Sequence, residues 1–314
     1  MESPDPKPSS GPALHLVAAR VTTAGPVQSD VAADGSSQAL ANTRIELVFD
    51  RYLDPRTATR QAVCLRSDPN PVESAEDCEG GVLLNVTYDP AGRVVTYYVD
   101  PGQTPSLLPA ATHYLTVYRA QGEGEGAGFR AFDGARLEER RELFFQVVDP
   151  GGLEPQLPPV VDDATCEQTA TSFGVCASCH IRRPEATPDA PANEPPAGLE
   201  LDSLDRALAT GTRAAHGGSV GATGNQLGAK TPAKLGAGMP VLSPGDPGNS
   251  YLVYKMLAAT EVDAATLAPG ETERLRQGLI TGMPMPPDNV RENRPDEATV
   301  RQITTWIRSC QGGE

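Results

Sequence analysis

The stretch Arg44-Ile45-Glu46-Leu47-Val48-Phe49 alternates polar with apolar residues. A period of two is typical of a β-strand that buries one face. Similar short runs recur on both sides of it, and turn residues such as Asp89-Pro90-Ala91-Gly92 separate them. The expected strands are residues 14–21, 43–49, 82–88, 93–99, 112–118, 129–132 and 143–148. This series predicts an antiparallel, all-β sandwich at residues 13–149.

The same region resembles the bacterial Ig-like domains of surface-layer and exported proteins. The resemblance is carried by Ile45-Glu46-Leu47-Val48-Phe49-Asp50, Leu53-Asp54-Pro55-Arg56-Thr57, Val86-Thr87-Tyr88-Asp89-Pro90, and Leu108-Pro109 before Thr112-His113-Tyr114-Leu115-Thr116-Val117. It implies a sandwich that acts as a spacer, an adhesin or a docking surface. We expect the spacer or docking role.

The composition limits the function classes. At 314 residues the chain is long enough for two domains. Its 31 glycines and 30 prolines, with only 5% aromatic residues, indicate loop-rich domains joined by extended segments. The net charge of −15 disfavours nucleic acid and anionic lipid as partners. No apolar run is long enough for a membrane-spanning helix. Residues 1–12 are expected to form a flexible tether, and residues 150–163 a linker.

The second half of the chain has a different periodicity. Apolar residues there recur at helical spacing, interrupted by a Pro-rich insertion near 183–198 and a Gly-rich one near 217–238. The expected helices are residues 164–179, 201–210, 246–260, 271–280 and 296–310. The predicted fold class is therefore multidomain, with the N-terminal sandwich followed by an all-α domain at residues 164–314.

The motif with the clearest chemistry is Cys176-Ala177-Ser178-Cys179-His180, the Cys-x-x-Cys-His attachment sequence of c-type haem. Two thiols three positions apart at a helix end face the same side and can bond both vinyl groups of one porphyrin. The following His180 then lies under the iron as a neutral nitrogen ligand. The motif predicts one covalently attached haem c.

Three other interpretations of this motif remain open. A thioredoxin-like dithiol requires a preceding strand in a βαβ unit, and no such strand is expected before Cys176. A zinc site usually has a second close pair of ligands, whereas the remaining cysteines are dispersed. The third interpretation is a structural disulfide between Cys176 and Cys179, with His180 uninvolved.

The sixth position on the iron has several candidate ligands. Met285, in Gly282-Met283-Pro284-Met285-Pro286-Pro287, is the first choice because prolines stiffen its loop. The alternatives are Met283, Met239 and His216, or an open iron. His15 and His113 fall in the β pattern and are interpreted as ordinary strand residues.

At this point residues 164–312 resemble the cytochrome c family, in which a Met-Pro-Pro loop before the C-terminal helix supplies the distal ligand. Further matches are Ser243-Pro244-Gly245-Asp246-Pro247-Gly248-Asn249-Ser250-Tyr251-Leu252-Val253-Tyr254-Lys255 and Ile303-Thr304-Thr305-Trp306-Ile307. More than a hundred residues separate Cys176 from Met285, which is longer than in compact members. The two insertions are expected to account for the excess.

The four remaining cysteines fit two disulfides in an oxidising compartment. Cys64 and Cys78 would close a loop within the sandwich. The resemblance implies that Cys166 and Cys310 join the haem-bearing helix to the last helix. Free buried thiols are the alternative.

These cysteines indicate a periplasmic or cell-surface protein. Residues 1–6 have neither the basic nor the apolar region of a signal peptide. We therefore hypothesise that Met1 replaces a removed leader, and a lipid anchor at the native N-terminus stays open.

The expected function is one-electron transfer by an exported single-haem cytochrome with a transient redox partner, that is, a carrier rather than an enzyme. Two alternatives are a cell-surface binding or adhesive protein with an ancillary haem domain, and an open-iron haem peroxidase or sensor. The sequence does not indicate the oligomeric state.

Overall fold

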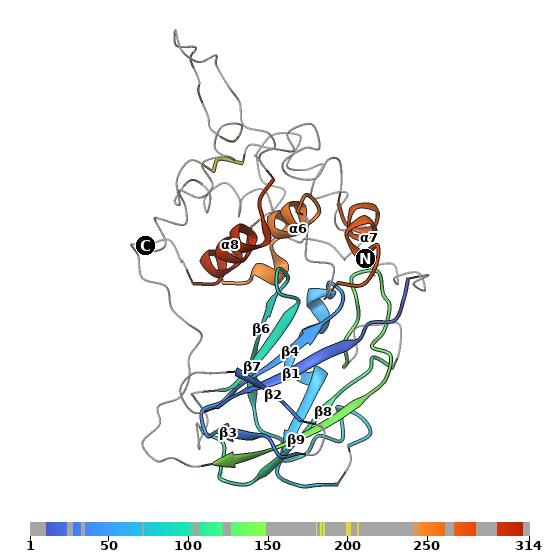
Figure 1. Cartoon of the computed structure of the whole chain (residues 1–314), viewed down its shortest axis with the longest axis vertical. Helices are drawn as coiled ribbons and strands as arrows, with labels where there is room; N and C mark the ends of the chain where they lie inside the picture. The colour runs from blue at the N-terminus through green and yellow to red at the C-terminus, as the bar shows by residue number, and fades with distance from the viewer. Residues whose placement is uncertain are drawn as a thin grey trace. The chain divides into compact units, whose positions relative to one another are not determined.

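The computed structural model describes residues 11–23, 28–32, 35–70, 72–100, 102, 107–121, 127–148, 180, 183, 185, 199–201, 206, 242–243, 245–260, 267–280 and 294–309. The chain divides into two compact units (Figure 1). One unit consists of residues 5–158 with residues 266–268, and the other holds the remainder. The predicted linker at 150–163 and, apart from Arg183 and Glu185, both predicted insertions lie outside the described residues.

The first unit contains two β-sheets, drawn from blue to green in Figure 1. The five-stranded sheet has the order β2-β1-β4-β7-β6 and is antiparallel throughout. Its strands are β2 (Gln28–Asp30), β1 (Leu16–Thr22), β4 (Arg44–Phe49), β7 (Val94–Val99) and β6 (Leu84–Asp89). β4 pairs with both β1 and β7, which places the decisive alternating stretch at the centre of the sheet.

The four-stranded sheet has the order β3-β9-β8-β5. Its strands are β3 (Gln38–Leu40), β9 (Arg141–Val148), β8 (Thr112–Val117) and β5 (Val63–Arg66). β3 pairs parallel with β9, and the other two pairs are antiparallel. The order β1-β4-β7-β6 opposite β9-β8-β5 is that of the seven-stranded immunoglobulin sandwich, with β2 added beside β1 and β3 added beside β9.

The core of this unit lies between the two sheets. Ile45, Leu47 and Phe49 of β4 are buried, and they belong to one apolar cluster with Leu115 of β8 and Phe145 of β9. Members from both sheets occur in this single cluster, so the sheets pack face to face. Alternate residues of β7 are buried as well, as the period of two predicts.

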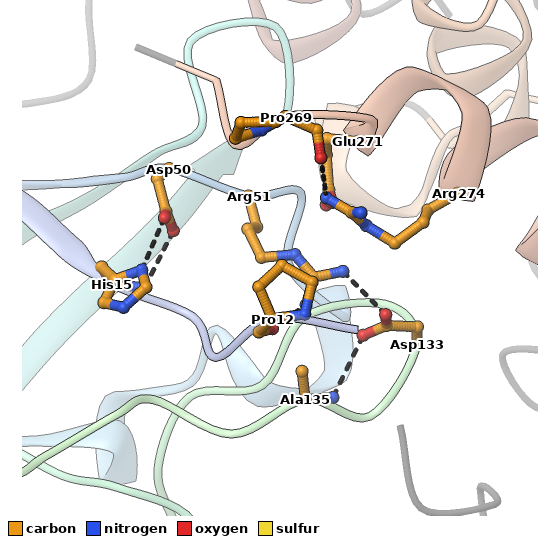
Figure 2. A network of polar contacts seen from close by, with 9 residues as sticks. All are labelled: Pro12, His15, Asp50, Arg51, Asp133, Ala135, Pro269, Glu271 and Arg274. Carbon is orange, nitrogen blue, oxygen red and sulfur yellow. Dashed lines mark hydrogen bonds and ion pairs between the residues drawn. The ribbon is translucent and has the colours of Figure 1, made fainter. Parts of the chain in front are cut away.

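A buried arginine ties the first described residues to this sandwich (Figure 2). Arg51 donates from Nη1 to the carbonyl of Pro12, over 2.6 Å, and from Nη2 to a carboxylate oxygen of Asp133, over 2.7 Å. His15 bonds Asp50 through both its backbone N–H and its ring Nδ1. Pro12 is therefore bonded to the sandwich, although the sequence analysis placed it in the flexible tether at residues 1–12.

The strand predictions succeed at the long runs and fail at the short ones. All six strands of six or more residues were expected from the sequence, within a few residues at each end. The three-residue strands β2 and β3 were missed, as was β5. In the expected strand at residues 129–132, residues 129–131 form isolated bridges, such as Leu53 with Ala131, and no named strand.

In the second unit, the prediction of a separate all-α cytochrome c-like domain at residues 164–314 is wrong. The described part of the chain is mostly β, and its only helices longer than one turn are α6 (Tyr251–Leu257), α7 (Glu271–Gly278) and α8 (Glu297–Ser309). The expected helix at 164–179 and, apart from Leu201 and Arg206, the one at 201–210 lie outside the described residues.

The physical reason is that periodicity alone does not make a helical domain. A short helix is stable only when its apolar face packs against neighbouring elements. Gly-rich and Pro-rich segments separate the periodic runs here, and both residue types disfavour helix. The observed helices form where the periodic apolar residues are also buried, as they are in α6.

The disulfide expected in the sandwich is present. Cys64 of β5 is joined to Cys78, which lies 14 residues further on. Both sulfur-bearing residues contact a small cluster with Val72 and Tyr118, and the Tyr118 hydroxyl donates to the carbonyl of Ser74. Beyond the end of β5, the described residues of the loop that this bond closes form no strand.

Replacing Cys64 and Cys78 together by Ala is expected to lower the free energy of unfolding of the sandwich by about 3 kcal/mol, because the open loop gains conformational entropy when unfolded. Urea unfolding followed by far-ultraviolet circular dichroism measures this change. Trp306, the only tryptophan, lies in the other unit, and its fluorescence transition is the internal control. An unchanged β transition would contradict the stabilising role.

His113 of β8 is fully buried and stacks at 6.0 Å on Phe145. Its Nε2 lies 2.9 Å from the carbonyl of Pro109, so Nε2 carries the proton and donates. Nδ1 has no hydrogen-bond partner in the described part of the chain. Burial lowers the pKa of His113, with the Pro109 bond acting in the opposite direction.

Because the folded state disfavours protonated His113, the unfolded state binds more protons, and the sandwich should lose stability as the pH falls below the ordinary histidine value. We expect His113→Gln to lose less stability than the wild type between about pH 8 and about pH 5.5. Urea midpoints by circular dichroism give the comparison. Equal losses in the two proteins would show that His113 does not contribute.

Candidate functional site

His180 is the one residue of the haem-attachment motif that the structure describes. Its side chain is buried at 9% exposure. Nδ1 of its ring lies 2.9 Å from the carbonyl oxygen of Leu199, and its own carbonyl accepts a 2.8 Å hydrogen bond from the N–H of Leu201. Leu199 and Leu201 are themselves buried. The histidine is therefore held by a segment 19 residues further along the chain.

These contacts fix the state of the imidazole. A carbonyl oxygen only accepts hydrogen bonds, so Nδ1 must carry the proton and Nε2 keeps a lone pair. Burial lowers the pKa of His180, the Leu199 bond opposes this, and the positive charge of Lys255 lowers the pKa further. The side chain is thus neutral near pH 7, which is the form that binds a metal.

The arrangement fits an axial ligand to haem iron. Metal-ligating histidines usually donate their second ring N–H to a carboxylate or a backbone carbonyl, which orients the ring and raises its basicity. His180 does this through Leu199. His180 could therefore bind a metal through Nε2, and its role as a haem ligand stays a prediction.

The other predicted site residues lie outside the described residues. They are Cys176, Cys179, Met285, Met283, Met239, His216, Cys166 and Cys310. The structure therefore does not test their roles. Within the described ranges, no three His, Cys, Asp or Glu residues form a group suited to a metal ion. An axial haem ligand is a single side chain and needs no such group.

Helix α6 carries a charged residue that the sequence analysis did not assign, Lys255. Its positive charge lowers the pKa of His180. Its Nζ is 5.9 Å from the ring centroid of Tyr251, one helical turn earlier. Burial lowers the pKa of Lys255 as well. A lysine in the otherwise apolar run Tyr251–Leu257 was the available signal.

Polar contacts hold the start of α6. The N–H of Ser243 donates to Oγ of the buried Ser250 over 2.9 Å, and this hydroxyl in turn donates to the carbonyl of Asp246. Asp246 also caps the 3-10 turn η4 (Pro247–Asn249) by accepting from the N–H of Asn249. The Tyr254 hydroxyl donates to the carbonyl of Gly248. These bonds position α6 and, with it, Lys255.

Helix α8 packs against α6 and closes this part of the unit. Val300, Ile303 and Ile307 form a buried stripe along α8, and Trp306 is buried beside it. The carbonyl of Ile307 accepts a 2.7 Å bond from the N–H of Gly245, at the end of the loop before α6. The helices thereby support each other.

The third helix, α7, is held at its first turn. Arg274 donates to the buried carboxylate of Glu271, over 2.8 Å, and to the carbonyl of Pro269 (Figure 2). The buried carboxylate of Glu271 is thus paired with the guanidinium of Arg274.

Within the described ranges, no helix is both long enough and apolar enough to cross a membrane.

Comparisons with known proteins provide little guidance. No protein-family model matches the chain, and no curated protein does. Two solved structures of the surface-layer protein SbsC, one of a recombinant fragment and one of its domains 1–6, match with 11% identity over 48% of this chain. The matched region is 15% of those chains, and the TM-scores are 0.26 and 0.27. At such values the likeness carries no argument about this protein.

Proposed function

We propose that this protein carries one covalently attached haem c and transfers single electrons in an exported compartment. The observation that carries the proposal is the buried, neutral imidazole of His180, whose Nδ1 donates to Leu199 and whose Nε2 retains its lone pair. This residue directly follows the two cysteines of the attachment motif.

Each residue has a defined task in this proposal. Cys176 and Cys179 hold the porphyrin through thioether bonds, and His180 provides the proximal nitrogen. Met285 is the proposed sixth ligand, with Met283, Met239 and His216 as alternatives. A haem held in this way supplies a one-electron couple between ferric and ferrous iron. Leu199 fixes the tautomer and orientation of His180, and this keeps the imidazole ready to bind iron.

The compartment and the partner follow from other features. A disulfide between Cys64 and Cys78 is typical of proteins that fold in an oxidising environment, so we place the protein in the periplasm or at the cell surface. The net charge of −15 favours a redox partner with a basic surface, and such pairs usually form small, short-lived interfaces. The sandwich would serve as the spacer or docking module.

A cell-surface binding protein with an ancillary haem is the second candidate. It is favoured by the large share of the described residues that the two-sheet sandwich occupies, since loops on such scaffolds are common binding surfaces. This candidate predicts that a protein without haem still binds the partner of the sandwich as the haem-loaded protein does.

Expression with a periplasmic leader and haem-maturation factors tests the main proposal. A pyridine haemochrome assay with intact-mass analysis should find one haem per chain. Replacement of Cys176 and Cys179 by Ala should abolish covalent attachment, because no thioether can form. Cys64→Ala with Cys78→Ala is the matched control, since it also removes two cysteines and should retain the haem. Wild-type protein without haem would refute the proposal.

The optical spectrum of the same protein separates an electron carrier from an open-iron peroxidase or sensor. A ferric haem with a methionine ligand shows a weak long-wavelength charge-transfer band, which a five-coordinate haem lacks. Met285→Ala should remove this band. A band that persists would exclude Met285 and direct the next substitution to Met283. A wild-type protein without the band would contradict methionine ligation.

A further inference from the structure

Three ionisable side chains from separate segments meet on the sandwich unit. His15 directly precedes β1, Asp50 directly follows β4, and Glu138 lies shortly before β9. Nδ1 of the His15 ring is 2.7 Å from Oδ2 of Asp50, a contact drawn in Figure 2. Nε2 of the same ring is 3.3 Å from Oε2 of Glu138. Both ring nitrogens therefore face a carboxylate.

Backbone hydrogen bonds fix the positions from which these side chains extend. The N–H of His15 donates to Oδ1 of Asp50 over 2.8 Å, and the N–H of Asp50 donates to the carbonyl of His15. The N–H of Glu138 donates to the carbonyl of Leu14, again over 2.8 Å. The segments that carry the three side chains are thus bonded to one another, so the fold itself brings the imidazole and the two carboxylates together.

The hydrogen bond to Asp50 decides the tautomer of the neutral His15 ring. An ionised carboxylate only accepts hydrogen bonds, so Nδ1 donates its proton to Asp50 and Nε2 keeps a lone pair. This lone pair faces Oε2 of Glu138, which is also an acceptor. Two acceptors at this separation repel each other unless a positive charge, either a proton or a metal ion, lies between them.

The 3.3 Å separation of Nε2 and Oε2 fits a shared metal ion. In tetrahedral sites, zinc lies about 2.1 Å from both histidine nitrogens and carboxylate oxygens, so two such ligands are about 3.4 Å apart. Zinc accepts this mixed donor pair, whereas calcium and magnesium prefer oxygen ligands alone. A carboxylate that accepts from the second ring N–H, as Asp50 does, is a common partner of a metal-bound histidine.

We propose that Nε2 of His15 and Oε2 of Glu138 bind a zinc ion at the surface of the sandwich, and that Asp50 is the positioning residue that orients the imidazole. The side chains of His15 and Glu138 are 43% and 64% exposed, so water can fill the other two positions on the ion. Asp50 contacts the ring and not the ion, and the site therefore has two protein ligands. The proposal does not depend on the haem.

Isothermal titration calorimetry of the matured full chain with zinc chloride tests this site. His15→Gln removes the imidazole and should abolish one equivalent of bound zinc. Glu138→Gln should weaken that equivalent by at least about tenfold, since loss of a ligand costs no less than loss of its outer partner. Glu139→Gln is the matched control, because it removes a neighbouring exposed carboxylate that pairs with Arg141 and should leave zinc binding unchanged.

The comparison between variants assigns the bound zinc to this site. Every variant retains the other histidines and all six cysteines, so zinc bound elsewhere on the chain contributes equally to each titration. Equal zinc binding by the wild type and His15→Gln would overturn the proposal and leave an ordinary ion pair between His15 and Glu138. A Glu139→Gln variant that binds as weakly as Glu138→Gln would also overturn it, since the effect would then be one of general charge.

A measurement on the wild type needs no variant to fold. In nuclear magnetic resonance, zinc should shift the ¹⁵N signal of Nε2 of His15 and leave Nδ1 protonated. No shift at either nitrogen would overturn the site, and zinc bound at Nδ1 would overturn the positioning role of Asp50. That role also predicts that Asp50→Asn weakens zinc binding about tenfold. An unchanged affinity in this variant would contradict it.

Discussion

The hydrogen bond from Nδ1 of His180 to the carbonyl of Leu199 is the interaction on which the proposed site depends. It decides which ring nitrogen carries the proton and which keeps a lone pair. The bond from Leu201 to the carbonyl of His180 adds a second contact between the same two segments. Together they hold a buried, neutral imidazole in one orientation, whereas the cysteine motif alone states only where a haem would be attached.

The two units are stabilised by different means. The sandwich has one continuous apolar core between its sheets, supplemented by the disulfide and by the buried Arg51. In the second unit, short helices depend on contacts with one another, such as those between α6 and α8 and the bond from Gly245 to Ile307. A helix as short as α6 would be unstable in isolation. A substitution at Lys255 therefore affects a helix, α6, that owes its stability to contacts with its neighbours.

Sequence reasoning succeeded where a pattern has a direct physical cause. In β4, period-two alternation reflects burial of Ile45 and Leu47, so the strand was predictable. The strand β2 consists of the polar residues Gln28–Asp30 and is extended because it pairs with β1, a tertiary effect that its own composition does not encode.

The same limit explains the wrong prediction of an all-α domain and the missed residues of the site. Helical periodicity correctly located α6, α7 and α8, but it cannot show whether enough neighbouring helices exist to build a domain. The acceptor for His180 is a backbone carbonyl 19 residues away, and every residue type offers the same carbonyl. Only folding brings Leu199 to this position.

An experimental structure of the matured, haem-loaded protein would test the central claim most directly. The account predicts a bond from Nε2 of His180 to iron, with Nδ1 still donating to the carbonyl of Leu199. Iron bound through another residue, or a His180 whose Nδ1 has turned away from Leu199, would contradict it.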